Sequence, residues 1–153
     1  MSTIAFRKAV ADDLPAIVAL LDDDALSKGR EDPSLPLDPR YVAGFEAIDA
    51  HPNQLQVVAE RDGEVIGTMQ LSFLPGIAFR GGWRGQIEAV RIAGELRGQG
   101  LGGAMIDWAV ERFRERGCHM AQLTSMNTRT DAHRFYERLG FTATHEGFKL
   151  LLP

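Results

Sequence analysis

The sequence predicts one α/β (α+β) domain over residues 1–153, with a mixed, mostly antiparallel central sheet flanked by helices. Two kinds of apolar pattern support this: short runs with alternating apolar residues, typical of strands, and longer runs with helical spacing. Their order is the third observation, because antiparallel strand signals come first, then strand–helix–strand, then helix–strand. Neither an internal repeat nor an interdomain linker interrupts this order.

The N-terminal third begins with a short alternating strand, Ile4–Lys8. Asp12 and Asp13 can cap the helix that follows, since short polar side chains accept hydrogen bonds from a helix N-terminus. Residues 28–39 are rich in proline and are expected to form a mobile connection beside a binding site. A second helix is predicted over residues 39–50, ending before Pro52.

The remaining elements follow from the same patterns and from turn residues. We expect strands at 54–60, 64–73, 85–93 and 118–124, helices at 100–116 and 131–139, and a final strand or hairpin at 140–152. The sequence Arg-Asp-Gly at 61–63 marks a hairpin turn, and Gly117 is a typical helix stop.

Composition excludes several classes of protein. Hydrophobic residues make up 44% and charged residues 25%, which is ordinary for a soluble domain. A net charge of −4 disfavours a nucleic-acid binder and slightly favours cationic or neutral small molecules. The chain has neither the apolar core of a signal peptide nor the roughly 18 apolar residues of a membrane span, so a cytoplasmic protein is expected. With a single cysteine, Cys118, and histidines that lack ligand spacing, we expect no disulfide framework and no metal site.

The sequence RGQGLGG at 97–103 fits two ligand fingerprints. Gly98, Gly100 and Gly103 match G-x-G-x-x-G, whereas Arg97, Gly100 and Gly102 match R-x-x-G-x-G. Because the loop joins a strand to a helix, its N–H groups and the helix dipole favour an anion, most naturally a phosphate. The glycines alone are explained equally well by tight strand–helix packing.

The residues that follow the loop do not fit a dinucleotide-binding site. It requires an acidic residue about 20 positions further on, at the end of the next strand. That region reads Gln122-Leu-Thr-Ser-Met-Asn, and the next acid, Asp131, lies on a different element. A nucleotide-dependent oxidoreductase is therefore a weak alternative. A P-loop is excluded because no Lys-Ser/Thr pair follows the glycines.

Two stretches together carry a family resemblance. IEAVRIAGELRGQGLGGAMIDWAVERFRERGC resembles the acetyl-CoA-binding core of the GCN5-related N-acetyltransferases (GNAT), and LTSMNTRTDAHRFYERLGF resembles their asparagine-bearing strand end and following helix. The resemblance covers Gln86 to Phe141. It implies a GNAT-like fold and an enzyme that moves acetyl from acetyl-CoA to a primary amine by direct attack in a ternary complex. Family members are often dimers, so a homodimer is a further expectation. The charge, hydropathy and histidine spacing given above predict no nucleic-acid or membrane partner and no metal.

The resemblance assigns the acetyl-CoA contacts. In the family the strand before the loop splays at a bulge, and here the backbone of Val90, Arg91 and Ile92 would bind the pantetheine arm. The Val90 N–H would also face the thioester oxygen. The loop residues Gly98, Gln99, Gly100, Leu101, Gly102 and Gly103 would hold the pyrophosphate, with Arg97 adding charge. Asn127 matches the strand-end asparagine that bonds the CoA arm, although asparagine also favours a plain turn.

Two residues are candidate catalysts. Tyr136 matches the family tyrosine beside the CoA sulfur and would protonate the departing thiolate; alternatively it is an amphipathic core residue. Glu88 lies two positions before Val90 on the same strand face and could accept the amine proton; alternatively it is a solvent-facing strand residue. Their presence argues against a non-catalytic acyl-CoA-binding or sensing module, the main rival function.

Other polar residues near these motifs carry weaker signals. Trp83 and Arg84 precede the core strand and could line an acceptor pocket or a hairpin loop. Arg129 and Arg134 are explained equally well by contacts with CoA phosphates or by a solvated helix face. His133, three residues before Tyr136 on the same helix, could approach the site, but such a residue is more often a partly buried surface histidine. The acceptor stays open between polyamine, aminoglycoside, amino acid, aminophosphonate and protein amine.

Overall fold

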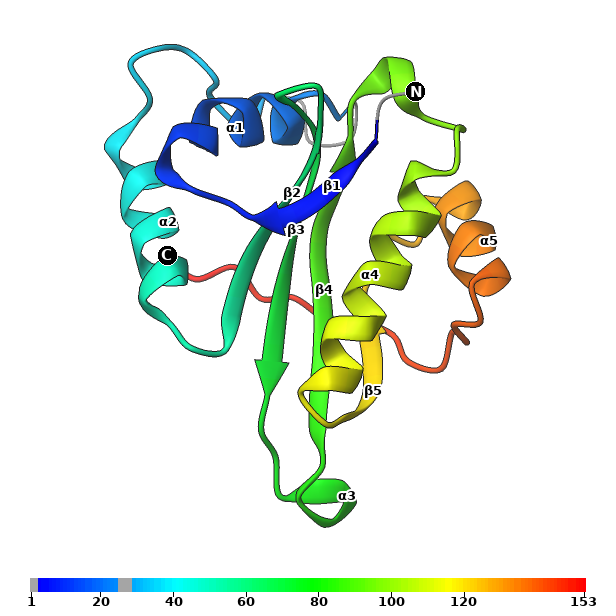
Figure 1. The fold of residues 1–153 in the computed structure, drawn as a ribbon. Helices are drawn as coiled ribbons and strands as arrows, with labels where there is room; N and C mark the ends of the chain where they lie inside the picture. Colours follow the sequence, from blue (N-terminus) through cyan, green and yellow to red (C-terminus); the bar gives the residue numbers. More distant parts are fainter. Residues whose placement is uncertain (1–2, 25–28) are drawn as a thin grey trace. The chain divides into compact units, whose positions relative to one another are not determined.

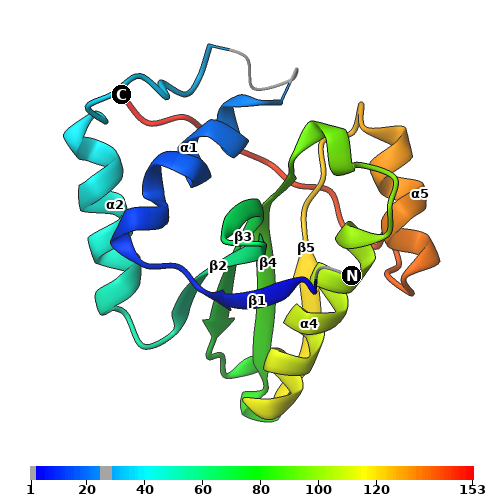
Figure 2. The same cartoon turned by 45° about the horizontal axis from the view of Figure 1, so that its top comes forward.

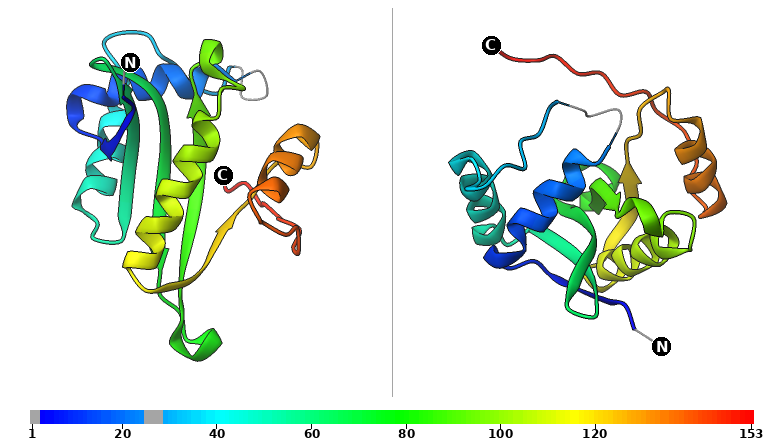
Figure 3. Two further views of the ribbon diagram at one scale, coloured as in Figure 1. Left: turned by 45° about the vertical axis from the view of Figure 1, so that its right-hand side comes forward. Right: turned by 90° about the horizontal axis from the view of Figure 1, so that it is seen from above.

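A five-stranded sheet in the order β1-β2-β3-β4-β5 organises the chain (Figure 1). The structure is a computed structural model that describes residues 3–24 and 29–153. The strands are β1 Ala5–Lys8, β2 Gln54–Arg61, β3 Glu64–Leu74, β4 Trp83–Ile92 and β5 Cys118–Leu123. Strands β1 to β4 pair antiparallel in chain order, while β5 runs in the direction of β4 (Figure 3), so the predicted mixed sheet is confirmed.

Helices connect and cover the strands. They are α1 Leu14–Asp22, α2 Pro39–Ala50, α3 Ala78–Gly81, α4 Leu101–Glu115 and α5 Thr130–Arg138, with short 3-10 turns at Ala11–Asp13 and Gly94–Leu96. The chain forms two units, the first ending at Gln122 and the second comprising Leu123–Pro153. Helix α5 belongs to the second unit, and the other helices belong to the first.

In the first unit, helices cover the two faces of the sheet differently (Figures 2 and 3). On one face, Ile17 and Val18 of α1 join Val58 of β2 in a buried apolar cluster. On the other face, α4 packs so closely that a Cβ built at Gly85 would lie 2.2 Å from the Phe113 ring. Burial of these apolar groups on both faces is the main favourable term that holds α1 and α4 to the sheet.

Most predicted elements are confirmed within a few residues, including the hairpin at 61–63, where Asp62 and Gly63 both have positive φ. The final strand at 140–152 is wrong: residues 141–153 form neither helix nor strand. Phe148 is 91% exposed in this segment. Apolar alternation indicates which side chains could face a core, but a strand also needs an edge to pair with. In the described part of the chain no strand pairs with this segment.

The predicted mobile connection at 28–39 is only partly covered by the structure. Lys28 lies outside the described residues, and residues 29–38 form no helix or strand. Asp38 ends this connection as the N-cap of α2, where its side chain accepts a hydrogen bond from the Arg40 N–H.

Candidate active site

A bulge interrupts β4 just before the glycine loop. Thr68 of β3 faces Arg91, and Gln70 faces Glu88, so Met69 alone stands opposite both Ala89 and Val90. Ala89 has a φ of 52°, which is unusual for a residue other than glycine. A bulge takes main-chain groups out of the regular ladder. The bulge that the family resemblance implies is therefore present, at Ala89 and Val90.

The glycine loop is built around positive φ angles. Gly98 has a φ of 80° and Gly100 a φ of 84°, and Gly100 is the N-cap of α4. The N–H of Ala104 donates to the Gly100 carbonyl at 3.2 Å, which is the first hydrogen bond of the helix. The N–H groups of residues 101–103 therefore lie before the intrahelical hydrogen bonds begin. Among the described residues, and apart from the neighbouring backbone, no atom lies within 4 Å of a Cβ built at Gly98 or Gly100. N–H groups at a helix start, beside this space, fit a bound pyrophosphate.

Side chains of the loop are anchored to the protein. The Arg97 guanidinium donates to the Asp23 carbonyl at 2.9 Å and lies 3.8 Å from its carboxylate. Gln99 donates to the Glu95 carbonyl at 3.1 Å, and Leu101 is 5% exposed. These contacts leave the main chain, rather than the Gln99 and Leu101 side chains, to face a ligand.

An ion pair joins β4 to the end of α1. The Arg91 guanidinium lies 3.2 Å from the Asp24 carboxylate and donates to the Val90 carbonyl at 2.9 Å. Both side chains are largely buried, at 17% and 10% exposed. Sequence analysis missed Asp23 and Asp24 as partners of the site. The only signal was the run of three aspartates, residues 22–24, before the connection.

Glu88 lies immediately before the bulge with its carboxylate exposed. Its Oε1 accepts a hydrogen bond from the Gln86 amide at 2.7 Å. Gln86 in turn accepts from Gln122 of β5 at 2.9 Å. The carboxylate of Glu88 and the bulge thus lie on β4, and the glycine-rich start of α4 follows on the next segment.

Comparison with known proteins decides the family. The family model described as Acetyltransferase (GNAT) family matches residues 16–141. The chain belongs to this family.

Individual relatives and solved structures are similar to the chain over nearly its whole length. The chain is 31% identical over 148 residues to the aminoalkylphosphonate N-acetyltransferase of Salmonella typhimurium, covering 97% of this chain and 91% of that protein. A crystal structure of a transcriptional regulator from Bacillus halodurans C-125 is 43% identical and matches with a TM-score of 0.95, over 98% of this chain and 100% of that one. A Trypanosoma brucei acetyltransferase is 27% identical and matches with a TM-score of 0.79, over 98% of this chain and 100% of that one.

The second unit of this acetyltransferase holds the other predicted site residues. The Tyr136 ring is half-buried and contacts Phe135 and Phe141, with ring centroids 5.1 and 5.9 Å away. Asn127 is exposed in a turn, and the His133 ring lies 2.9 Å from the Met126 carbonyl. The roles of Tyr136 and Asn127 at the loop stay predictions.

The remaining sequence candidates of the acetyltransferase lie around β4 and β5. Trp83 and Arg84 are both half-buried at the start of β4, and alternation directs them to opposite faces. Cys118 is half-buried, and its burial raises the pKa of the thiol. The described residues contain no group of three potential metal ligands, and none of their helices is long and apolar enough to cross a membrane.

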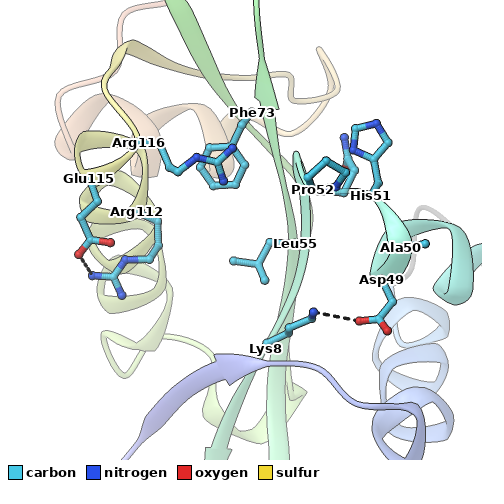
Figure 4. A pocket seen from close by; sticks show the side chains of 11 residues that line it. Lys8, Asp49, Ala50, His51, Pro52, Leu55, Phe73, Arg112, Glu115 and Arg116 are labelled. Carbon is cyan, nitrogen blue, oxygen red and sulfur yellow. Dashed lines mark hydrogen bonds and ion pairs between the residues drawn. The ribbon is translucent and has the colours of Figure 1, made fainter.

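A cavity of about 390 Å³ lies away from the glycine loop, between the start of β2 and the C-terminal half of α4 (Figure 4). Its charged groups already have partners: Lys8 pairs with Asp49 at 3.1 Å, and Arg112 pairs with Glu115 at 2.7 Å. None of the predicted site residues lines this cavity. The catalytic and acetyl-CoA-binding candidates named above therefore lie outside this cavity.

Proposed function

We propose that this acetyltransferase transfers the acetyl group of acetyl-CoA to the amine of a small molecule, by direct attack while both substrates are bound. The observation that supports this most is the juxtaposition on adjoining segments of the glycine loop at the start of α4, the bulge at Ala89 and Val90, and the Glu88 carboxylate.

The glycine loop is the proposed donor site. The N–H groups of Leu101, Gly102 and Gly103 would bond the pyrophosphate, helped by the positive end of the α4 dipole. Gly98 and Gly100 leave the space that the phosphate oxygens need. Arg97 would add positive charge beside them while staying tied to Asp23. Bound acetyl-CoA supplies a thioester, whose acyl carbon is open to attack by an amine.

The chain's own groups then serve three tasks. The Val90 N–H, taken out of the ladder by the bulge, would donate a hydrogen bond to the acyl oxygen. Glu88 would accept a proton from the acceptor ammonium, directly or through a water, so that the amine becomes nucleophilic. Tyr136 would donate its hydroxyl proton to the departing sulfur. Holding both substrates in one site lowers the activation barrier further, because the amine and the acyl carbon are already positioned to react.

Small amines are the proposed acceptors. The relative from Salmonella typhimurium is an aminoalkylphosphonate N-acetyltransferase, so aminoalkylphosphonates belong in any first panel. Homodimer formation is a separate proposal that rests on the family resemblance alone.

The test is turnover of acetyl-CoA with a panel of amines, followed by release of the free CoA thiol and by mass spectrometry of the acetylated product. The Cys118→Ala variant removes the protein's single thiol from the assay. We expect amine-dependent thiol release. Saturable acetyl-CoA binding without turnover on any amine would instead indicate a non-catalytic acyl-CoA-binding module.

Two glycine variants locate the donor site. Gly100→Val should raise the KM for acetyl-CoA at least tenfold, because its side chain would occupy the space proposed for the pyrophosphate. Gly117→Val is the matched control. Gly117 also has a positive φ, 74°, and among the described residues no atom apart from the neighbouring backbone lies within 4 Å of an added Cβ, but Gly117 lies at the other end of α4. Equal effects of the two variants on this KM would contradict the assignment.

A further inference from the structure

Two rows of polar side chains cross one face of the sheet, running from β2 through β3 to β4. In the antiparallel register Gln54 faces Ser72 and Ser72 faces Gln86; one step along, Gln56 faces Gln70 and Gln70 faces Glu88. Directly opposed residues point to the same side of a sheet. We call these six residues the polar rungs.

The opposite side of the same strands is apolar. There Leu55 faces Leu71 and Leu71 faces Ile87, and the last two are 0% and 2% exposed beneath α4. On the side of the polar rungs, α1 packs over the end of the sheet near Val58. From Val58 back toward the start of β2, the next residues on this face are Gln56 and Gln54. An apolar core would have continued with apolar residues at these positions.

Hydrogen bonds hold the polar rungs in place. The Gln54 Oε1 accepts from both Gln70 and Ser72, each at 3.0 Å. Gln86 donates to Glu88 at 2.7 Å and accepts from Gln122, which extends the row to β5. An amide group has two N–H donors and two acceptor lone pairs. The bonds among the described residues use only part of this capacity, and four of the six side chains, all of them glutamines, are half-buried rather than fully covered.

The polar rungs begin at the proposed reacting centre, because Glu88 is both the proposed base and the last residue of its rung. Resting on the proposed function, we propose that the polar rungs bind the non-reacting part of the acceptor, which lies along the sheet from Glu88 toward β2. Two strand spacings of about 4.8 Å let a molecule roughly 10 Å long span the rungs.

The chemistry of the polar rungs names the acceptor class. Amides present donors and acceptors side by side, which matches hydroxyl groups, since a hydroxyl both donates and accepts. Apart from Glu88 the six residues carry no charge, so they contain no cation for an acidic acceptor. The acceptor is therefore a hydroxyl-rich primary amine, such as an amino polyol or amino sugar.

The test compares two amines with the same six-carbon chain: 1-amino-1-deoxyglucitol, which carries five hydroxyls, and hexylamine, which carries none. We expect the wild type to show a kcat/KM at least tenfold higher for the amino polyol. Gln70→Leu should reduce this preference about tenfold by removing hydrogen bonds to the hydroxyls, with the KM for acetyl-CoA unchanged. Gln54→Leu provides an independent variant if Gln70→Leu does not fold.

Glu64→Leu is the matched control, because Glu64 is exposed at the start of the same strand, β3, away from the polar rungs. It should leave the preference intact. A preference that survives Gln70→Leu and Gln54→Leu, equal rates for the two amines, or turnover confined to 2-aminoethylphosphonate would overturn the assignment while leaving the proposed function standing. Absence of turnover with every amine would overturn the proposed function itself, and this assignment with it.

Discussion

Ala89 adopts a left-handed backbone conformation, with a φ of 52°, directly before the N–H group proposed to contact the acyl oxygen. Such a conformation costs a non-glycine residue of order 1 kcal/mol or more. It persists here because β4 pairs with β3 on both sides of the bulge, at Glu88 and at Arg91. Alanine does not favour a positive φ, so the sequence gives no sign of this strain, and the backbone dihedral angle of the folded chain reveals it.

Tyr136 is the residue on which the proposed chemistry depends most. Tyr136→Phe removes only the hydroxyl, and the ring contacts with Phe135 and Phe141 can be kept. We expect kcat to fall by about 10² or more, while the dissociation constant of acetyl-CoA stays within about twofold, because a general acid acts in the transition state. Steady-state kinetics together with calorimetric titration of acetyl-CoA measure both. An unchanged kcat would remove Tyr136 from the mechanism and leave it as a packing residue.

At the scale of elements, close contact between β4 and α4 depends on Gly85. A Cβ at this position would meet the Phe113 ring at 2.2 Å, and Phe113 is 2% exposed. We expect Gly85→Ala to lower the free energy of unfolding by about 1–3 kcal/mol through overpacking. Denaturant titration measures the change. Since β4 carries Glu88 and α4 carries the glycine loop, the same variant should also lower activity.

The control for this packing effect is Gly44→Ala in α2. Among the described residues, and apart from the local helix backbone, no atom lies within 4 Å of a Cβ built at Gly44. The variant should therefore leave the free energy of unfolding unchanged or raise it by up to about 1 kcal/mol. Adding Phe113→Leu to Gly85→Ala should cost less than the sum of the two single changes, because the smaller side chain makes room for the methyl group. If the two changes in the free energy of unfolding simply add, the added methyl group and the Phe113 ring do not clash.

At the scale of the whole first unit, one arginine ties three segments together. Arg7 of β1 binds both carboxylate oxygens of Asp13, at 2.7 and 2.9 Å, and bonds Glu60 of β2 at 2.5 Å. Asp13 also accepts from the Val10 N–H at 2.8 Å. The expectation that Asp12 or Asp13 caps the first long helix is therefore wrong for Asp13, which is the N-cap residue but makes no side-chain cap bond.

This network predicts acid sensitivity. The Arg7 hydrogen bonds, aided by the Val10 N–H, hold the pKa of Asp13 below its usual value. A depressed carboxyl pKa stabilises the folded state above the unfolded-state pKa of about 4, and this contribution is lost as the pH falls toward the folded-state value. Asp13→Asn should lower the free energy of unfolding at neutral pH by about 2 kcal/mol and flatten its decline below pH about 4. Unfolding curves of both proteins between pH 7 and 3 test this, and parallel declines would contradict it.

Much of this protein follows from local sequence. The order of strands and helices, the hairpin at Asp62 and Gly63, and the glycine-rich turn into α4 depend on short-range periodicity, turn conformation and helix geometry. Neighbouring residues determine all three. The two motifs around Gly100 and Tyr136 likewise predict the acetyltransferase family, and the family model that matches residues 16–141 confirms it.

Tertiary structure decided everything that depends on which distant residues meet. The pairing of Arg97 and Arg91 with Asp23 and Asp24, the strain at Ala89 and the alignment of the polar rungs all require the strand register, which short-range patterns leave open. The missing strand at 141–153 has the same cause, because a strand exists only where a paired edge supplies its hydrogen bonds. Local sequence determined what each segment can do, and long-range pairing determined which segments do it together.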